Sequence, residues 1–408
     1  MELNNQGRTV KKPKLWTSMY IRLGIATVLL TLVEQIITVN MSLYIEDLGA
    51  SEMMIGATVT VFNIAAMIAR FLTGPMLDRK GRLAVGLFGL YLSLIPIVGF
   101  IVFPAVTIIL ILRFLQGIGY SCTSLSQGTM SADIPHPDRM DEGVGYYGLF
   151  FSVASAIGPA AGLKIAEKFG YDMMFIFCLV VFVAGIIITY TLNYEKKRGI
   201  VYKQEKRESK KLKVSDFIEK AAMSTAVVGF FASVITSIVT SFLAVYARRI
   251  GVEGTGVFFT LSAAMTFVGR IISGKLTAKR KRVTVLLIGN ALMFIGMIII
   301  ALVQNTTQLY IGGIIFGLGG GYTWPALAIL AVCDVEESRR GTANSTYYAF
   351  YDLGLGAGGF IGGVVAEWFG YRNLFLVGIL IAVISVVLTV VLFKNKLKAE
   401  SAKAPSIT

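Results

Sequence analysis

Two opposite charges stand inside apolar runs of the first half of the chain. Glu34 interrupts LVEQIITVN, and Arg113 interrupts IILILRFLQ. A charge at bilayer depth costs about 2.5–3.5 kcal/mol on insertion scales unless it faces a cavity or a partner. Counted along the helical rise, Glu34 lies ~12 Å and Arg113 ~10 Å from the same membrane surface. Their shared depth makes the two residues candidates for a functional pair.

The alternative is a fixed buried ion pair that only orders the helices around Glu34 and Arg113. The second half of the chain has Gly313 where Arg113 stands, and uncharged residues near Thr236 in place of Glu34. This asymmetry favours function. We predict that Glu34 is a protonation site that also meets a cationic or polar substrate, and that Arg113 tunes its proton affinity.

A third charge, Asp352, lies within YYAFYDLGLGAGG, and Ser152 stands at the equivalent place in the first half. Asp352 is predicted to be a second proton carrier or a substrate contact. The alternative is an acid held by hydrogen bonds from tyrosines and from the backbone of small residues.

The composition predicts a membrane protein that crosses the bilayer many times. Of the 408 residues, 55% are hydrophobic and 15% are charged, against roughly 25% charged in soluble domains. The net charge of +14 comes from basic residues in short loops, so we expect no nucleic-acid partner. Three apolar-run cysteines and the single His136 lack metal-ligand spacing. We expect no catalytic residue, metal or cofactor, and no enzyme activity.

Twelve apolar runs are long enough to cross a bilayer. The polar, lysine-rich stretch 194–220 divides them into an N-terminal bundle, 1–193, and a C-terminal bundle, 221–408. The fold class is therefore an all-α membrane protein. The predicted spans are 17–42, 54–76, 83–104, 106–132, 143–165, 171–193, 221–247, 255–277, 283–303, 308–333, 343–366 and 372–393.

The basic residues predict the orientation. Lys and Arg gather before the first span, between spans 2 and 3, in the 194–220 linker, between spans 8 and 9, between spans 10 and 11, and after the last span. With twelve spans, all of these fall on one side, which the positive-inside rule assigns to the cytoplasm. We expect both termini to be cytoplasmic, in a bacterial inner membrane, and the protein to be a monomer.

The two bundles repeat each other at a constant offset of 200 residues. RFLTGPMLDRKGR starts at Arg70 and RIISGKLTAKRKR at Arg270; AEKFGY and AEWFGY end at Tyr171 and Tyr371. Parallel repeats of this kind place a substrate site at their interface, near the membrane midplane.

The stretch GPMLDRKGR, from Gly74 to Arg82, and the stretch RFLQGIG, from Arg113 to Gly119, carry a resemblance. They resemble the loop 2–3 signature G-x-L-x-D-R-x-G-R and the helix 4 signature of the major facilitator superfamily, so two pseudo-symmetric six-helix bundles of that fold are expected. The family's first and fourth helices are neighbours, which implies that Glu34 and Arg113 pair directly or through water. The resemblance also implies that Asp78 faces the start of span 11 and that Arg82 meets Asp133. The gating residues that it implies are Gly74, Asp78, Arg79, Gly81, Arg82 and Asp133.

Span 5 resembles the helix 5 signature G-x-x-x-G-P-x-x-G-G of the family's antiporters through Gly158, Pro159 and Gly162. It departs from that signature at Ala154 and Leu163. The resemblance favours export, whereas ordinary small-residue packing is the alternative. Aromatic residues near an acid suit lipophilic cations. The predicted substrate cavity is lined by Glu34, Gln35, Arg113, Tyr147, Thr236, Trp324, Tyr347 and Asp352.

These features together predict a drug:proton antiporter that works by alternating access. It would export small amphiphilic compounds, lipophilic or cationic, and would be driven by the proton gradient. Three alternatives stay open: an exporter of one metabolite or metallophore, a symporter or facilitator for nutrient uptake, and a transporter-like receptor or lipid-handling protein.

Overall fold

A computed structural model describes residues 2–3, 9–10, 13–197, 218–278, 281–336 and 339–402. Within these ranges the chain is almost entirely helical, as predicted, apart from two-residue antiparallel strands at the N-terminus, β1 (Glu2–Leu3) and β2 (Thr9–Val10). Eleven described helices are long and apolar enough to cross a membrane.

The N-terminal half contains the first five of these helices, a short 3-10 helix before the fifth, and a short helix after it. They are α1 (Ser18–Asp47), α2 (Glu52–Lys80), α3 (Arg82–Val102), α4 (Val106–Asp133), η1 (Pro137–Arg139), α5 (Met140–Tyr190) and α6 (Tyr194–Lys197). The C-terminal half repeats the series. Its elements are η3 (Lys220–Ala222), α7 (Met223–Arg249), α8 (Thr255–Ala278), α9 (Arg282–Ala301), α10 (Thr306–Val332), α11 (Arg340–Phe369), α12 (Tyr371–Leu392) and α13 (Lys394–Ala402).

Helix α5 is two spans joined end to end. It has 51 residues, about 77 Å at the helical rise, whereas a bilayer core is about 30 Å thick. Gly170 inside it has φ 84°, and Gly370, between α11 and α12, has φ 81°. Glycine populates this left-handed region at little cost, so the chain turns back at both positions. Counting α5 twice gives the twelve predicted spans.

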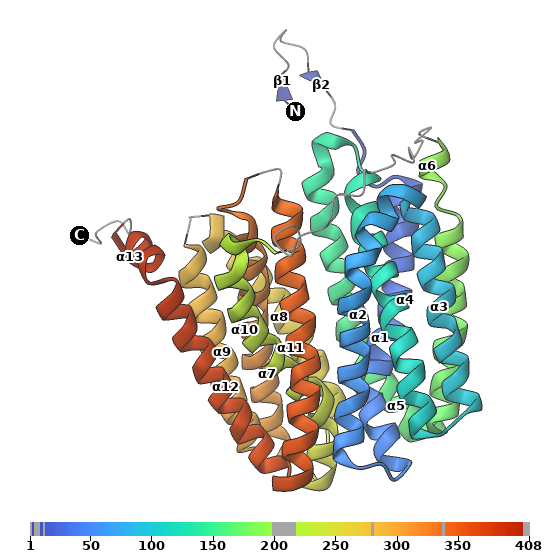
Figure 1. Ribbon diagram of the computed structural model, residues 1–408, viewed down its shortest axis with the longest axis vertical. Helices are drawn as coiled ribbons and strands as arrows, with labels where there is room; N and C mark the ends of the chain where they lie inside the picture. Colours follow the sequence, from blue (N-terminus) through green and yellow to red (C-terminus); the bar gives the residue numbers. More distant parts are fainter. Residues whose placement is uncertain are drawn as a thin grey trace.

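Both termini lie at one end of the bundle (Figure 1). We call this end the termini face; it also carries α6 and α13. The opposite end, with the turns at 48–51, 250–254 and Gly370, is the far face. Glu195 accepts hydrogen bonds from the amides of Arg82 (2.7 Å) and Leu83 (3.3 Å) at the start of α3. Glu400 does the same for α9, so each half caps its third helix with an acid from beyond its last span.

Repeated glycines bring the helices of each half close together. A side chain at Gly117 would meet the Phe62 carbonyl at 2.2 Å, and one at Gly317 would meet the Ser262 carbonyl at 2.1 Å. These positions are equivalent, and both let α4 or α10 approach the second helix of its half. Small residues at such crossings allow helix backbones to approach closely in lipid.

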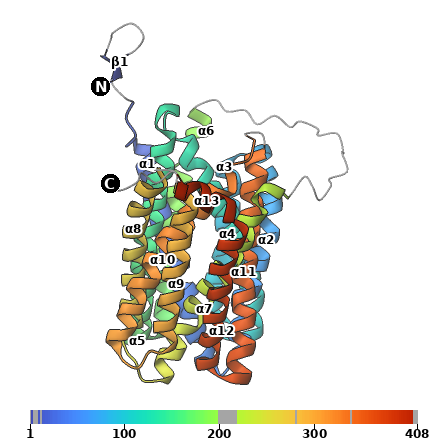
Figure 2. The ribbon, with the colours of Figure 1, turned by 90° about the vertical axis from the view of Figure 1, so that its left-hand side faces the viewer.

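Two pairs of helices make the most extensive contacts between the halves, and α7 also contacts α1 and α2. Helix α2 packs against α11, and α5 packs against α8 (Figure 2). The equivalent residues Thr60 and Thr260 tie them together. Thr60 donates to the Gly356 carbonyl at 2.8 Å, and Thr260 donates to the Ala156 carbonyl at 3.0 Å. The two interfaces are therefore related by the same repeat as the halves.

Candidate functional site

Glu34 of α1 and Arg113 of α4 are joined through the side chain of Gln116. Arg113 Nη1 donates to Gln116 Oε1 at 2.9 Å, and Gln116 Nε2 donates to Glu34 Oε2 at 3.2 Å. Thr38 donates to the other carboxylate oxygen at 3.4 Å. Arg113 is 1% exposed, whereas Glu34 is half-buried. An amide thus stands where the sequence predicted a direct or water-mediated contact.

Contacts with α2 draw the Arg113 guanidinium away from Glu34. Its Nε donates to the Thr58 carbonyl at 3.4 Å, and its central carbon lies 4.3 Å from the centre of the Phe62 ring. The ring face attracts the cation. Both nitrogens of Arg113 with a described hydrogen bond therefore use partners other than Glu34, and the described residues show no ion pair between the two.

Asp352 of α11 forms an ion pair with Arg70 of α2 across the interface between the halves. Arg70 Nε donates to Oδ2, and Nη2 donates to Oδ1 at 3.4 Å. The Asp352 side chain is 3% exposed. Tyr348 lies beside the pair, with its ring centre 5.6 Å from the guanidinium of Arg70. This forked contact is the strong form of an Arg–carboxylate bond.

Sequence reasoning missed the role of Arg70. It aligned Arg70 with Arg270 as part of the repeat, but it gave Asp352 only tyrosines and backbone as possible partners. The signal was present: Arg70 is ten residues inside the end of α2, or ~15 Å, which is mid-bilayer depth. An arginine at that depth requires a partner.

Arg270 of α8 stands at the position equivalent to Arg70, and it faces Ser152 in place of an acid. Its Nη1 lies 3.4 Å from Ser152 Oγ and 3.5 Å from the Gly148 carbonyl. Its Nε is buried without a hydrogen-bond partner. Among the described residues no carboxylate pairs with Arg270. The two interfaces therefore differ by one negative charge.

Aromatic side chains surround the charges on α11 and its neighbours. Trp324 contacts Tyr351 edge to face with ring centres 5.2 Å apart, and Tyr147 lies within electrostatic range of Arg70 and Tyr348. Tyr347 is 3% exposed and packs in the core of the C-terminal half. Tyr120, which sequence reasoning did not select, lies within electrostatic range of Glu34, Arg70 and Asp352.

Gly158 and Gly162 of α5 pack against α1, the helix that carries Glu34. A side chain at Gly158 would meet Gln35 Cβ at 2.7 Å, and one at Gly162 would meet Asn40 Nδ2 at 2.3 Å. Pro159 lies between them within α5. The remaining predicted cavity residue, Thr236, is half-buried and donates to the Ala232 carbonyl of its own helix at 3.0 Å.

Arg82 donates from Nε to Asp133 Oδ2 at 3.1 Å, which is the contact that the resemblance implies. Both residues belong to the N-terminal half, so this contact cannot itself hold the two halves together. Gly81 has φ 93° and separates α2 from α3, while Arg79 is exposed and Gly74 has open space beside it. The side chain of Asp78 lies outside the described residues.

Ion pairs join the halves at the far face. Arg248 and Arg249 of α7 contact acids of α1 and α2. Arg248 pairs with Asp47 (2.8 Å) and Glu46, and Arg249 pairs with Glu46 (2.9 Å) and Glu52 (2.6 Å). The largest hydrophobic core, which includes Ile45 of α1 and Val245 of α7, lies behind them. The far face is therefore closed between α1, α2 and α7.

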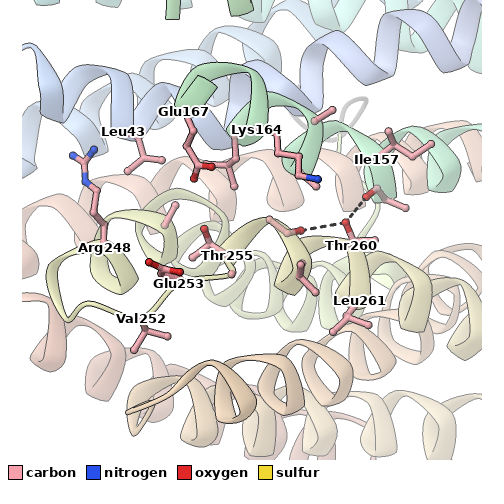
Figure 3. A pocket seen from close by; sticks show the side chains of 18 residues that line it. Leu43, Ile157, Lys164, Glu167, Arg248, Val252, Glu253, Thr255, Thr260 and Leu261 are labelled. Carbon is pink, nitrogen blue, oxygen red and sulfur yellow. Dashed lines mark hydrogen bonds between the residues drawn. The ribbon is translucent and has the colours of Figure 1, made fainter. Parts of the chain in front are cut away.

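A pocket of about 870 Å³ opens beside the closed contacts, between the outer parts of α5 and α8 (Figure 3). Lys164 and Glu167 of α5 line one wall, and Glu253 and Thr255 line the other. The α2–α11 interface has no such room at the equivalent place. There a side chain on Gly56 would meet the Gly359 carbonyl at 2.2 Å.

Comparison with known proteins gives consistent results. The family model described as Major Facilitator Superfamily matches residues 23–332 and, in a second match, 255–408. The staphylopine export protein of Staphylococcus aureus is 23% identical over 379 residues, which cover 90% of this chain and 94% of that protein. An uncharacterized MFS-type transporter of Methanocaldococcus jannaschii is 25% identical over 350 residues, covering 82% of this chain and 88% of that one.

Solved structures share the fold at low sequence identity. A POT family transporter in complex with 5-aminolevulinic acid has a TM-score of 0.79 and 13% identity, covering 93% of this chain and 96% of that one. A bacterial homolog to the human lysosomal transporter Spinster has a TM-score of 0.75 and 15% identity, covering 95% and 99%. These likenesses extend over both halves.

Proposed function

Because the chain belongs to the major facilitator superfamily and is a multi-pass membrane transporter rather than an enzyme, we propose that it exports small amphiphilic compounds in exchange for protons. Alternating access would expose the site between the halves first to one face and then to the other. The termini face would be cytoplasmic, because the basic loops lie there, and the membrane would be a bacterial inner membrane.

The observation that carries this proposal is the setting of Glu34. Its carboxylate is half-buried, accepts hydrogen bonds from Gln116 and Thr38, and makes no ion pair with any described residue. A carboxylate in a direct ion pair would resist protonation, whereas one held by neutral donors can gain and lose a proton as its surroundings change. Protonation of Glu34 would remove the negative charge that is linked to Arg113 through Gln116.

The ion pair between Arg70 and Asp352 gives the second step. It joins the halves at mid-depth, so separating the halves there would break a buried ion pair. A proton on Asp352 would neutralise the acid and weaken its contact with Arg70. In the proposed cycle, protons from the far face load the carboxylates, the cargo leaves toward that face, and the return movement releases the protons at the termini face.

Two features support export rather than uptake. The glycines at 158 and 162 pack against the helix of Glu34, as a helix 5 signature of exporters would require if it couples α5 to the proton site. The second feature is the likeness of the whole chain to a staphylopine export protein.

The proposal is tested with the purified chain in proteoliposomes under an imposed pH gradient. Ethidium, pyrenebutyrate and an amino-acid mixture serve as cargo. We expect gradient-driven exchange to vanish in Glu34→Gln, which cannot ionise, and to persist in Glu34→Asp. The matched control is Asp172→Asn, because Asp172 is exposed and lies away from the site.

Coupling that is unchanged in Glu34→Gln would remove Glu34 from the mechanism and make Asp352 the proton site. Movement of cargo in the same direction as protons would replace export by symport.

A dedicated exporter of one metabolite or metallophore is the second candidate. The arginines at 70, 113 and 270 outnumber the acids at 34 and 352, so the charges described between the halves sum to about +1. A purely cationic cargo would meet this excess unfavourably, whereas an amphiphile with an acidic group would not. A transport response to a single compound in the cargo panel would favour this candidate.

A further inference from the structure

We propose that Arg270, together with the tyrosines of α11, binds a carboxylate group of the transported compound where Ser152 supplies no acid, and that the cargo is therefore an amphiphilic carboxylate. This inference rests on the proposed transport function and names the chemical class of its cargo. The distinguishing feature is a guanidinium at the interface between the halves that lacks the acid present at the equivalent position.

The equivalence of Arg70 and Arg270 is geometric as well as numerical. Ten residues before each arginine, Thr60 and Thr260 make the same hydrogen bond to the opposite half, at 2.8 Å and 3.0 Å. The acceptors are the backbone carbonyls of residues 356 and 156, which lie four positions beyond Asp352 and Ser152. Each arginine therefore faces the residue at its matching register, and Ser152 occupies the place of a carboxylate.

Arg270 has more donors than the protein satisfies. A guanidinium carries five N–H groups. The described contacts of Arg270 are two long ones from Nη1, at 3.4 Å to Ser152 and 3.5 Å to Gly148, and its Nε has no partner. Leaving a cation uncompensated at membrane depth is energetically costly. A bound anion would remove this cost.

The residues beside Arg270 suit an anion with an apolar body. Gly148 has no side chain, and a Cβ there would stand 3.6 Å from Arg270 Nη1. Tyr347, Tyr348 and Tyr351 lie within electrostatic range of the guanidinium, and Trp324 contacts Tyr351. Aromatic faces bury apolar groups well, and their hydroxyls can donate to an anion.

A single carboxylate fits the available charge better than a phosphate. The planar guanidinium fork matches a carboxylate with two parallel hydrogen bonds. A phosphate dianion would call for a second cation, but Arg70 is already paired with Asp352 and Arg113 is held by Gln116 and Phe62. The site therefore offers one uncompensated positive charge.

The experiment uses the full chain in nanodiscs of phosphatidylcholine at neutral pH, without a proton gradient. The probes are pyrenebutyrate and the uncharged pyrenebutanol, and binding is followed through quenching of tryptophan fluorescence. Ser152→Asp supplies the missing acid and recreates the pair seen at the other interface. Arg270→Gln removes the cation, Arg270→Lys retains the charge without the fork, and Ser152→Ala is the matched uncharged control.

We expect the Kd for pyrenebutyrate to rise about tenfold or more in Ser152→Asp and Arg270→Gln, less in Arg270→Lys, and little in Ser152→Ala. Pyrenebutanol should bind equally to all of them, which also reports that each variant is folded. Equal binding of pyrenebutyrate to the native chain and to both charge variants would overturn the proposal. So would a parallel loss of pyrenebutanol binding.

Two further arms identify the source of the anion. Displacement of pyrenebutyrate by inorganic phosphate, or its loss in nanodiscs that contain phosphatidylglycerol, would assign the site to a phosphate or a lipid headgroup and overturn the cargo assignment. Failure of the proposed function is recognised separately. Proton coupling is measured with Glu34→Gln under a gradient, whereas this binding requires no gradient and leaves Glu34 intact.

Discussion

The α2–α11 and α5–α8 interfaces have equivalent backbone contacts but differ in the side chains between their helices. Thr60 and Thr260 make equivalent hydrogen bonds across them. Near the far face, α2 and α11 touch through glycines, with Gly56 against Gly359. The positions equivalent to Gly359 and Gly363 are Pro159 and Leu163. Leu163 lines a pocket of about 870 Å³ between α5 and α8.

The charges differ in the same direction as the packing. The tight α2–α11 interface contains a complete ion pair, and the looser α5–α8 interface contains an arginine without an acid. The α2–α11 interface therefore pairs its own charges, whereas the α5–α8 interface has a pocket near the far face and, deeper along α8, an arginine without an acid. This difference locates the proposed ligand contact at α5–α8 and the proposed mechanical contact at α2–α11.

The largest expected effect comes from breaking the ion pair at the tight interface. In Asp352→Asn, Arg70 loses its counter-charge at mid-depth, and we expect the free energy of unfolding to fall by about 3–5 kcal/mol. Thermal unfolding in detergent measures this. The matched variant at the other interface, Ser152→Ala, should change it by less than about 1 kcal/mol.

The double variant Arg70→Gln with Asp352→Asn should regain part of the lost stability, because neither charge is then left alone. If Asp352→Asn and Ser152→Ala unfold at the same temperature, the two interfaces do not differ in the way described here.

Glycine substitution should separate the interfaces next. In Gly56→Ala the new methyl group would stand 2.2 Å from a backbone oxygen of Gly359, which cannot yield unless α2 and α11 move apart. We expect a loss of about 1–3 kcal/mol and slower transport. In Gly256→Ala the closest atom, Ala160 Cα, is 3.3 Å away, so a small shift should accommodate it. Unfolding temperature and cargo exchange rate check both, and a larger loss in Gly256→Ala would contradict the comparison.

The shared hydrogen bonds should respond alike. Thr60→Val and Thr260→Val keep the shape of the side chain but remove a donor at 2.8 Å and 3.0 Å. Each should cost about 0.5–1.5 kcal/mol, the net value of one such bond. The two unfolding curves should nearly coincide. Clearly different unfolding temperatures for the two variants would show that the backbone contacts at residues 60 and 260 are not equivalent.

The smallest effect is expected from a surface pair that belongs to neither interface and supplies a baseline. The hydrogen bond from Lys396 lowers the pKa of the Asp334 carboxyl, and the side chains of Lys396 and Asp334 are 45% and 57% exposed. Solvent screening limits such a pair to about 0–1 kcal/mol. Because the pKa is lower in the folded state, the contribution is complete above the unfolded pKa of about 3.9 and disappears as the pH falls through the folded value.

Native chain and Asp334→Asn should therefore differ slightly, and by a constant amount, from pH 7 to pH 5, as read from thermal unfolding. A difference that grows between pH 7 and pH 5 would mean that another group titrates with this pair.

Much of the fold follows from the sequence. Apolar runs of bilayer length predicted the twelve spans, because every backbone polar group in lipid must be satisfied within a helix. The 200-residue repeat predicted two equivalent halves, and the glycines at 117 and 317 make equivalent contacts. The shared depth of Glu34 and Arg113 could also be predicted from the sequence, because the helical rise converts residue number directly into depth.

The partners of the charges were decided by tertiary structure. Two residues can meet only if they lie at the same depth in the membrane. Whether they do meet depends on how each helix is rotated about its axis, and that rotation depends on packing across the whole bundle. For this reason Gln116 stands between Glu34 and Arg113, and Arg70 meets Asp352 from a helix 282 positions away in the chain. The sequence by itself determined where charge breaks the repeat. Only the packed helices determined that the broken position leaves Arg270 facing a serine.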